Sequence, residues 1–295
     1  MTIGAWSTRP VQSLLAGAID YAGLFPPAGL TMADTVRNYE SYRRSDDAWA
    51  LGRLVVAAGR LEELARARGE AGIEEPWGLT VTLGADWDAD REAIEAFERV
   101  ETCRVEALEG RTPDPGAAER LAGLRGSGRA LYAEVAPTGA LDGMLGALAR
   151  TDLSAKIRMG GVTPELIPPV SAVADFLAAL WRTSLAFKAT AGLHHPVRSD
   201  FALTYRPDSP RATMHGYLNL VLASLLAETG ADHALVSSAL SETDRAAIVV
   251  DASGIGWRSH RFGADAIHAL RSRFHGFGSC SFREPLDELQ PLVRS

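Results

Sequence analysis

Short apolar runs alternate with segments of helical spacing along most of this chain. In residues 79–83, Leu79, Val81 and Leu83 alternate with threonines, and residues 131–135 repeat this two-residue period. Such runs predict strands at 18–24, 54–58, 79–83, 104–109, 131–135, 155–159, 185–191 and 277–282. Around them, apolar positions three and four residues apart predict helices at 32–44, 61–68, 88–100, 117–124, 141–150, 164–181, 214–227, 264–274 and 286–292.

This order of elements predicts a fold. Eight strands that alternate with helices over 295 residues favour a (β/α)8 TIM-type barrel, with an open doubly wound sheet as the rival architecture. Residues 247–250 and 255–257 flank the turn sequence from Asp251 to Gly254, which predicts a β-hairpin inserted before the last barrel strand. The sequence contains no internal repeat or flexible linker, so residues 1–295 are expected to form one domain.

The two faces of the predicted strands differ in a way that favours the barrel. If Ala155, Ile157 and Met159 face the helices, then Lys156 and Arg158 face the interior. The same alternation places further polar side chains inside: Thr80, Thr82, Tyr132, Glu134, Lys188 and Thr190. Because barrel strands converge on one face, this interior row predicts a small-molecule site there.

Composition narrows the class of protein. With 30 Lys+Arg against 37 Asp+Glu, a net charge of -7 and no basic stripe, neither nucleic acid nor an anionic membrane is an expected partner. No apolar run reaches the roughly 18 residues of a membrane span, and no signal-peptide pattern is expected at the N-terminus. Two cysteines are too few for a disulfide framework, so a cytoplasmic location is expected. The apolar segment 214–227 fits a core helix, and a homo-oligomer stays open as an alternative.

Lysine is almost absent from the chain. Of the 30 lysine and arginine residues, only Lys156 and Lys188 are lysines, and both lie in short apolar runs that end at glycine. Their strands would be neighbours in a barrel, about 4.8 Å apart. Two close ammonium groups disfavour each other's charge, and a neutral amine can attack a carbonyl to form a Schiff base. Glu134 would then transfer protons, or it forms an ion pair with Lys156 that merely fills the barrel.

The segments that carry the two lysines resemble a known family. AKIRMGG around Lys156 and FKATAG around Lys188 are similar to the consecutive lysine strands of class I, Schiff-base aldolase barrels of the deoxyribose-phosphate aldolase kind. The resemblance implies that Lys156 forms the imine and that Lys188 lowers the pKa of its neighbour. The whole chain also resembles a family of bacterial proteins with the segments DYAGLFPP, FKATAGLHHP and FGSCSF, and this likeness implies no particular activity.

Histidines and a cysteine lie near the predicted mouth of the barrel. His194 and His195 follow the seventh strand directly, and we expect them to act as general acids or bases or to contact the substrate. Cys280 lies in the predicted eighth strand between small residues. Packing is the favoured interpretation of Cys280, and a nucleophile activated by a histidine is the alternative.

Other polar residues are expected to contact the substrate. Arginine forks suit carboxylate and phosphate groups, so an anionic compound is expected. Asp20 ends the first strand, where it could serve as acid, base, metal ligand or turn cap. The residues expected to bind substrate near the mouth are Asp20, Arg158, Thr190, Arg198 and His215.

These patterns support three functional hypotheses. The favoured one is a lyase or aldolase-type enzyme that acts on a small, anionic carbonyl compound through a lysine Schiff base and needs no cofactor. The second is a metal-dependent lyase, isomerase or hydrolase that holds a divalent metal through Asp20, Glu134, His194 and His215. The third is a non-catalytic barrel that binds a small molecule and uses its lysines as salt-bridge anchors.

Overall fold

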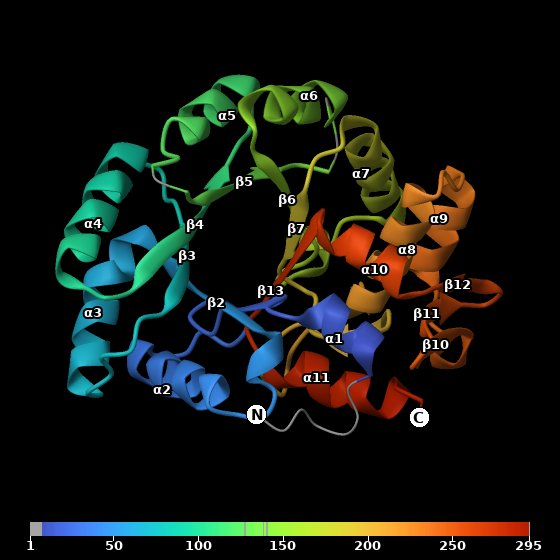
Figure 1. Cartoon of the computed structure of the whole chain (residues 1–295), viewed down its shortest axis with the longest axis horizontal. Coiled ribbons are helices and arrows are strands. Elements are labelled where there is room, and N and C mark those ends of the chain that lie inside the picture. The colour runs from blue at the N-terminus through green and yellow to red at the C-terminus, as the bar shows by residue number, and fades with distance from the viewer. Residues whose placement is uncertain (1–7, 127, 138, 140, 295) are drawn as a thin grey trace.

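Eight parallel strands close into a barrel in the computed structural model of this chain, which describes residues 8–126, 128–137, 139 and 141–294. The closed order is β1-β13-β7-β6-β5-β4-β3-β2. Figure 1 looks through the ring of strands, with the helices around its outside. The predicted (β/α)8 barrel is therefore confirmed, and the open doubly wound sheet is wrong.

Most elements agree with the predicted ranges to within about three residues, but the helix predicted from residue 164 begins only at Val170, after a 3-10 turn at Pro164–Leu166. The barrel strands are β1 (Ile19–Tyr21), β2 (Leu51–Ala57), β3 (Gly78–Thr82), β4 (Arg104–Arg111), β5 (Ala130–Val135), β6 (Ser154–Arg158), β7 (Phe187–Thr190) and β13 (Phe274–Ser279). The helices are α1 (Arg9–Leu15), α2 (Met32–Arg43), α3 (Leu61–Glu70), α4 (Trp87–Val100), α5 (Pro115–Ala122), α6 (Leu141–Thr151), α7 (Val170–Thr183), α8 (Tyr217–Glu228), α9 (His233–Ser241), α10 (Ala264–Arg271) and α11 (Arg283–Leu289). The sequence pattern did not predict α1 and α9. Within the described ranges, no helix is long and apolar enough to cross a membrane.

Two small antiparallel sheets are added to the barrel. The predicted hairpin before the last barrel strand is confirmed as β10 (Ile248–Asp251) and β11 (Gly254–Trp257), and β12 (His260–Phe262) extends it to three strands. The segment between β7 and α8 contains the hairpin of β8 (Ser199–Ala202) and β9 (Arg211–Met214), which the sequence pattern did not predict.

The last barrel strand starts and ends three residues earlier than the sequence pattern predicts. The sequence pattern predicts that the helix from residue 264 continues to residue 274, but α10 ends at Arg271 and Phe274 belongs to β13. The ring of Phe274 is buried against Phe187 of the neighbouring strand, with 5.0 Å between ring centroids. Cys280 consequently lies beyond the end of β13, at the mouth of the barrel instead of within the strand.

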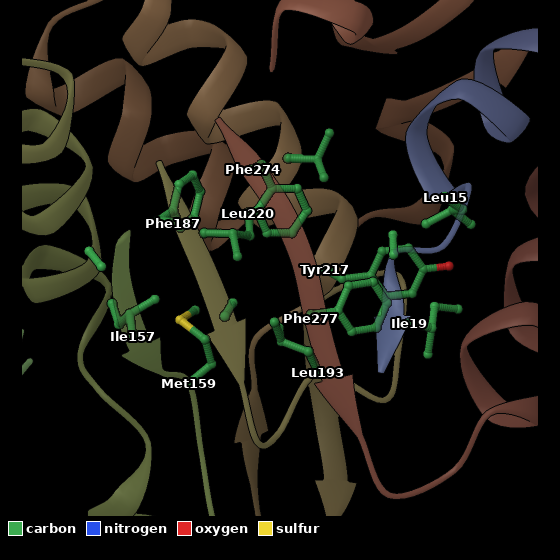
Figure 2. Close-up of a cluster of buried hydrophobic side chains, with 14 of the residues drawn as sticks. Leu15, Ile19, Ile157, Met159, Phe187, Leu193, Tyr217, Leu220, Phe274 and Phe277 are labelled. Atoms are coloured by element: carbon green, nitrogen blue, oxygen red, sulfur yellow. The ribbon is translucent and has the colours of Figure 1, made fainter. Parts of the chain in front are cut away.

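The hydrophobic core lies between the barrel wall and the helices. Ile157 of β6 and Met159, the residue after this strand, are fully buried in this core, as the strand alternation predicts (Figure 2). Tyr217 of α8 stacks on Phe277 of β13 with 5.0 Å between ring centroids. Burial of a large apolar side chain contributes about 1.5–3 kcal/mol, so this outer face fixes the register of each strand. The opposite face of the same strands can then carry polar side chains into the barrel.

Candidate active site

A cavity of about 700 Å³ opens at the C-terminal end of the barrel strands. Thr82, Arg111, Arg158 and Thr190 line it from the ends of β3, β4, β6 and β7. Residues 201–205, at the end of β8 and in the loop after it, form part of its wall. Substrate sites of (β/α)8 barrels lie at this end, because the loops after the strands converge there.

The two lysines lie side by side inside the barrel. Lys156 of β6 and Lys188 of β7 are register partners on neighbouring strands, as expected. Only 8% of the Lys156 side chain and 3% of the Lys188 side chain are exposed. Lys156 lines the cavity, whereas Lys188 is not among its lining residues. A small molecule in the cavity can therefore reach the Lys156 amine first.

Three carboxylates connect the lysines into one chain of ion pairs. Glu109 of β4 bridges both amines, with 2.7 Å from Oε2 to Nζ of Lys156 and 2.6 Å from Oε1 to Nζ of Lys188. Nζ of Lys156 also lies 2.7 Å from Oε2 of Glu134. At the other end, Nζ of Lys188 lies 2.5 Å from Oδ2 of Asp20. The order of contacts is thus Glu134, Lys156, Glu109, Lys188, Asp20.

Asp20 is the most firmly held member of this chain. Its Oδ1 accepts a hydrogen bond from the Arg53 amide N–H at 2.7 Å, and its Oδ2 accepts one from the Thr80 hydroxyl at 3.1 Å. Gly52 leaves room for it, because a Cβ at that position would stand 2.2 Å from Oδ1. The carboxylate predicted at the end of the first strand therefore orients Lys188 inside the barrel.

The ion pairs reverse part of the expected electrostatics. Burial disfavours the charged form of Lys188, but Asp20 and Glu109 outweigh burial and raise its pKa. Burial likewise opposes ionisation of Glu109, but Lys156 and Lys188 prevail and lower its pKa to about 2. The expectation that the lysine pair drives one amine towards neutrality is wrong for Lys188, because its ammonium contacts two carboxylates directly.

Glu109 is the member of the site that the sequence pattern missed. Strict alternation places Glu109 on the same face as Val105, which is buried against the helices. In the structure, β3 pairs Leu79 with Val105 and Thr80 with Ala107, so one extra residue in β4 changes the phase of the strand. Glu109 is thereby brought into the barrel. The available signal was chemical, because two buried lysines need carboxylate partners.

The cavity also offers groups that could bind an anionic compound. Arg158 lines the cavity and is solvent-exposed, and its guanidinium has no hydrogen bond or ion pair to another described residue. Arg111 lies 3.7 Å from Glu134 and remains 86% exposed. The hydroxyl of Thr190 is buried without a hydrogen-bond partner in the described ranges, and Thr190 lines the cavity. These positions fit the substrate-contact role expected for Arg158 and Thr190.

His194 and His195 both line the cavity, but their surroundings differ. Nδ1 of His194 lies 3.1 Å from Glu284, and burial is outweighed by Cys280 and Glu284, which raise the pKa of His194 to about 9. Nδ1 of His195 lies 2.7 Å from Glu288, and its ring stacks on Phe201. Burial lowers the pKa of His195. His194 therefore carries a proton at neutral pH, whereas His195 is neutral and forms part of the cavity wall.

Three residues expected to contact the substrate, Asp20, Arg198 and His215, are not among the residues that line the cavity, and Asp20 instead contacts Lys188. Nε2 of His215 donates to the Pro168 carbonyl at 2.8 Å, and Nδ1 accepts from the Arg198 guanidinium at 3.2 Å. Burial lowers the pKa of His215 to about 4, so the ring is neutral and connects two loops. The substrate-contact prediction for Arg198 and His215 is therefore corrected to a structural role.

The four ligands expected for a metal are engaged elsewhere. Asp20 and Glu134 contact lysines, and both nitrogens of His215 have partners. Across the described ranges, no group of three or more His, Cys, Asp or Glu side chains is arranged to hold a metal ion. The metal hypothesis stays a prediction from the sequence.

Comparison with known proteins gives no information on the function of this site. No family model, curated protein or solved structure matches the chain. The function must therefore be argued from the cavity and its residues.

Proposed function

We propose that this protein is a lyase of the aldolase type, in which Lys156 forms a Schiff base with a small carbonyl compound. The observation that carries the proposal is the position of Lys156. Its amine lines the cavity and contacts two carboxylates, Glu109 and Glu134, at 2.7 Å each. An amine that attacks a carbonyl must first lose a proton, and these oxygens stand within reach of that proton.

Glu134 is the better acceptor of this proton. Its side chain is 14% exposed and lines the cavity, whereas the Glu109 side chain is 2% exposed and is held by both lysines. In the proposed step, Lys156 passes one proton to Glu134, and the free amine adds to the carbonyl carbon. The Glu134 proton and the second amine proton then leave with the carbonyl oxygen as water.

The same carboxylates support the intermediate. A protonated imine carries one positive charge, as the lysine ammonium does, so Glu109 and Glu134 remain opposite a cation throughout. The iminium accepts the electron pair of the carbon–carbon bond that breaks, while Glu134 takes the proton of the hydroxyl group on the departing carbon, which leaves as a carbonyl compound. A proton then returns to the resulting enamine carbon. Glu134 or the protonated His194, which also lines the cavity, would supply it.

Arg158 and Thr190 support the choice of an anionic substrate. Neither side chain has a hydrogen-bond partner among the described residues, and both line the cavity that Lys156 faces. A guanidinium fork binds a carboxylate or phosphate group, and a buried hydroxyl gains from a polar partner. The proposed substrate is therefore a small carbonyl compound with one acidic group.

Borohydride trapping tests the imine directly. The protein is incubated with a panel of small aldehydes, ketones and 2-oxo acids, reduced with borohydride and analysed by peptide mass spectrometry. Reduction is expected to fix an adduct on Lys156 and not on Lys188. The matched control is Lys156→Arg, which keeps the charge but cannot form an imine. A chain that carries no adduct on Lys156 with any carbonyl compound would refute the proposal.

A second candidate is favoured by the completeness of the ion pairs. Each lysine contacts two carboxylates, as a purely structural anchor in a binding barrel would. This candidate predicts that the protein binds an anionic compound through Arg158 while Lys156 remains unmodified. Trapping and binding measured on the same sample distinguish the two functions.

A further inference from the structure

A second set of reactive side chains stands on the wall of the same cavity. Sγ of Cys280 lies 3.7 Å from Nε2 and 3.8 Å from Nδ1 of His194. Nδ1 of His194 also lies 3.1 Å from Oε2 of Glu284 and 3.3 Å from the Ser279 hydroxyl. The Tyr205 hydroxyl lies 3.7 Å from Sγ. A thiol, an imidazole and a carboxylate thus follow one another, with the thiol at the cavity.

The order of contacts assigns a role to each group. Glu284 holds the Nδ1–H of His194, which leaves Nε2 to face the sulfur. Cys280 and His194 are 6% and 5% exposed, and both line the cavity together with Glu284. A nucleophile beside a base that a third group orients is the arrangement that activates a thiol. Distances somewhat above hydrogen-bond length are common before a ligand binds.

We propose that Cys280, His194 and Glu284 form a second covalent site, in which the sulfur adds reversibly to the carbonyl carbon of a small aldehyde. The proton that the thiol gives up is held at Nε2 of the protonated His194, and the thiolate sulfur forms the new S–C bond. The carbonyl π electrons move to oxygen, and His194 returns the proton to that oxygen. The product is a neutral thiohemiacetal, and the step needs neither an oxidant nor a leaving group.

The surroundings favour an aldehyde over an acyl compound. Attack on an ester or amide requires amide N–H donors for the oxyanion. The amide N–H of Ser281, the residue after Cys280, is already donated to the Ser279 hydroxyl at 3.3 Å. Addition to an aldehyde needs one proton donor, which His194 supplies. The site uses neither lysine, so it stands apart from the proposed imine chemistry.

The other cysteine of the chain makes the test selective. Cys103 is 2% exposed, precedes β4 and is absent from the lining of the cavity. Burial raises the pKa of its thiol. Alkylation by iodoacetamide at pH 7, followed by peptide mass spectrometry, is expected to modify Cys280 at least about tenfold faster than Cys103. His194→Gln should slow alkylation of Cys280 at least about tenfold and leave the rate at Cys103 unchanged.

Protection by glycolaldehyde tests the addition itself. In Lys156→Arg, which cannot form an imine, glycolaldehyde should slow alkylation of Cys280 but not of Cys103, and dilution should reverse the protection. In the wild-type chain, borohydride reduces the free glycolaldehyde and fixes any imine, so protection that disappears after reduction is assigned to the thiohemiacetal and protection that remains is assigned to the imine. The proposal would be overturned if Cys280 were alkylated no faster than Cys103, or if His194→Gln did not change the rate at Cys280. It would also be overturned if glycolaldehyde did not slow alkylation of Cys280 in either protein.

Discussion

Replacing Glu109 by glutamine tests the central contact of the site. Glu109 is the carboxylate that touches both lysines, and it is fully buried. The connected ionised groups are Lys156, Lys188 and Arg111 against Asp20, Glu109 and Glu134, and their charges cancel. Glu109→Gln removes one negative charge and turns an N–H₂ group towards one of the ammoniums. Lys156 then keeps only Glu134, and Lys188 keeps only Asp20, as a charged partner.

The expected cost follows from burial. Removing one partner of a buried ion pair destabilises a protein by about 3–5 kcal/mol, because the remaining charge stays desolvated. For a chain of this size, 1 kcal/mol corresponds to about 2 °C in the melting temperature, so a fall of about 6–10 °C is expected. The matched control is Glu106→Gln on the same strand. Glu106 pairs with Arg53 at the surface, with 46% of its side chain exposed, and should cost less than about 1 kcal/mol.

A double variant separates the charge balance from other effects of the substitution. Glu109→Gln with Lys156→Met leaves Lys188 paired with Asp20 and Glu134 paired with Arg111, so each remaining charged group keeps a partner. We expect it to be less destabilised than the sum of the two single variants, as shown by a double-mutant cycle. The cycle uses the melting temperatures of the wild type, the two single variants and the double variant, measured by differential scanning calorimetry at pH 7. If Glu109→Gln melts at the same temperature as Glu106→Gln, or if the destabilisations of the two single variants are additive, the buried charge cluster does not stabilise the barrel.

Three further predictions concern other parts of the site. Arg158→Ala should weaken binding of an anionic carbonyl compound about tenfold to a hundredfold in titration calorimetry, and leave a neutral analogue unaffected. Cys280 and Glu284 outweigh burial and raise the pKa of His194 to about 9. The contribution of protonated His194 to the stability of the fold is therefore complete below pH 6.5 and is lost towards pH 9. The melting temperature should fall over that window in the wild type but stay flat in His194→Gln. Gly192 has a φ of 72°, and a Cβ at this position would stand 2.9 Å from Cα of Gly160. Gly192→Ala should therefore lower the free energy of unfolding in urea by about 1–3 kcal/mol. Gly143→Ala, in open space on α6, should not destabilise the protein.

The sequence predicts the barrel and the lysine pair for the same physical reason. Strand side chains alternate with a period of two, so the buried apolar face of β6 fixes which residues turn inwards. Ile157 and Met159 are in the outer core, and Lys156 consequently faces the interior. Lys188 follows by the same rule on β7, and neighbouring parallel strands then bring the two amines into register.

Irregularities of the backbone hide the rest of the site. The extra residue in β4 moves Glu109 inside, and no periodic pattern in six residues reveals it. The early start of β13 moves Cys280 from a strand to the mouth, where it meets His194. Contacts between distant loops are equally invisible, so the sequence offered no sign that His215 meets Pro168.

The balance of the charge cluster also decides which amine can react. Lys188 contacts two carboxylates, Asp20 and Glu109. The Thr80 hydroxyl and the backbone of β2 hold Asp20 in place. Lys156 shares Glu109 with it, but its second partner, Glu134, faces the cavity and the exposed Arg111. Proton loss from Lys156 onto Glu134 neutralises two neighbouring charges at once and leaves the deeper pairs intact. The same loss from Lys188 would leave Asp20 as an uncompensated buried anion, which costs several kcal/mol. The asymmetry of the carboxylates, more than any difference between the lysines, therefore selects Lys156 as the nucleophile.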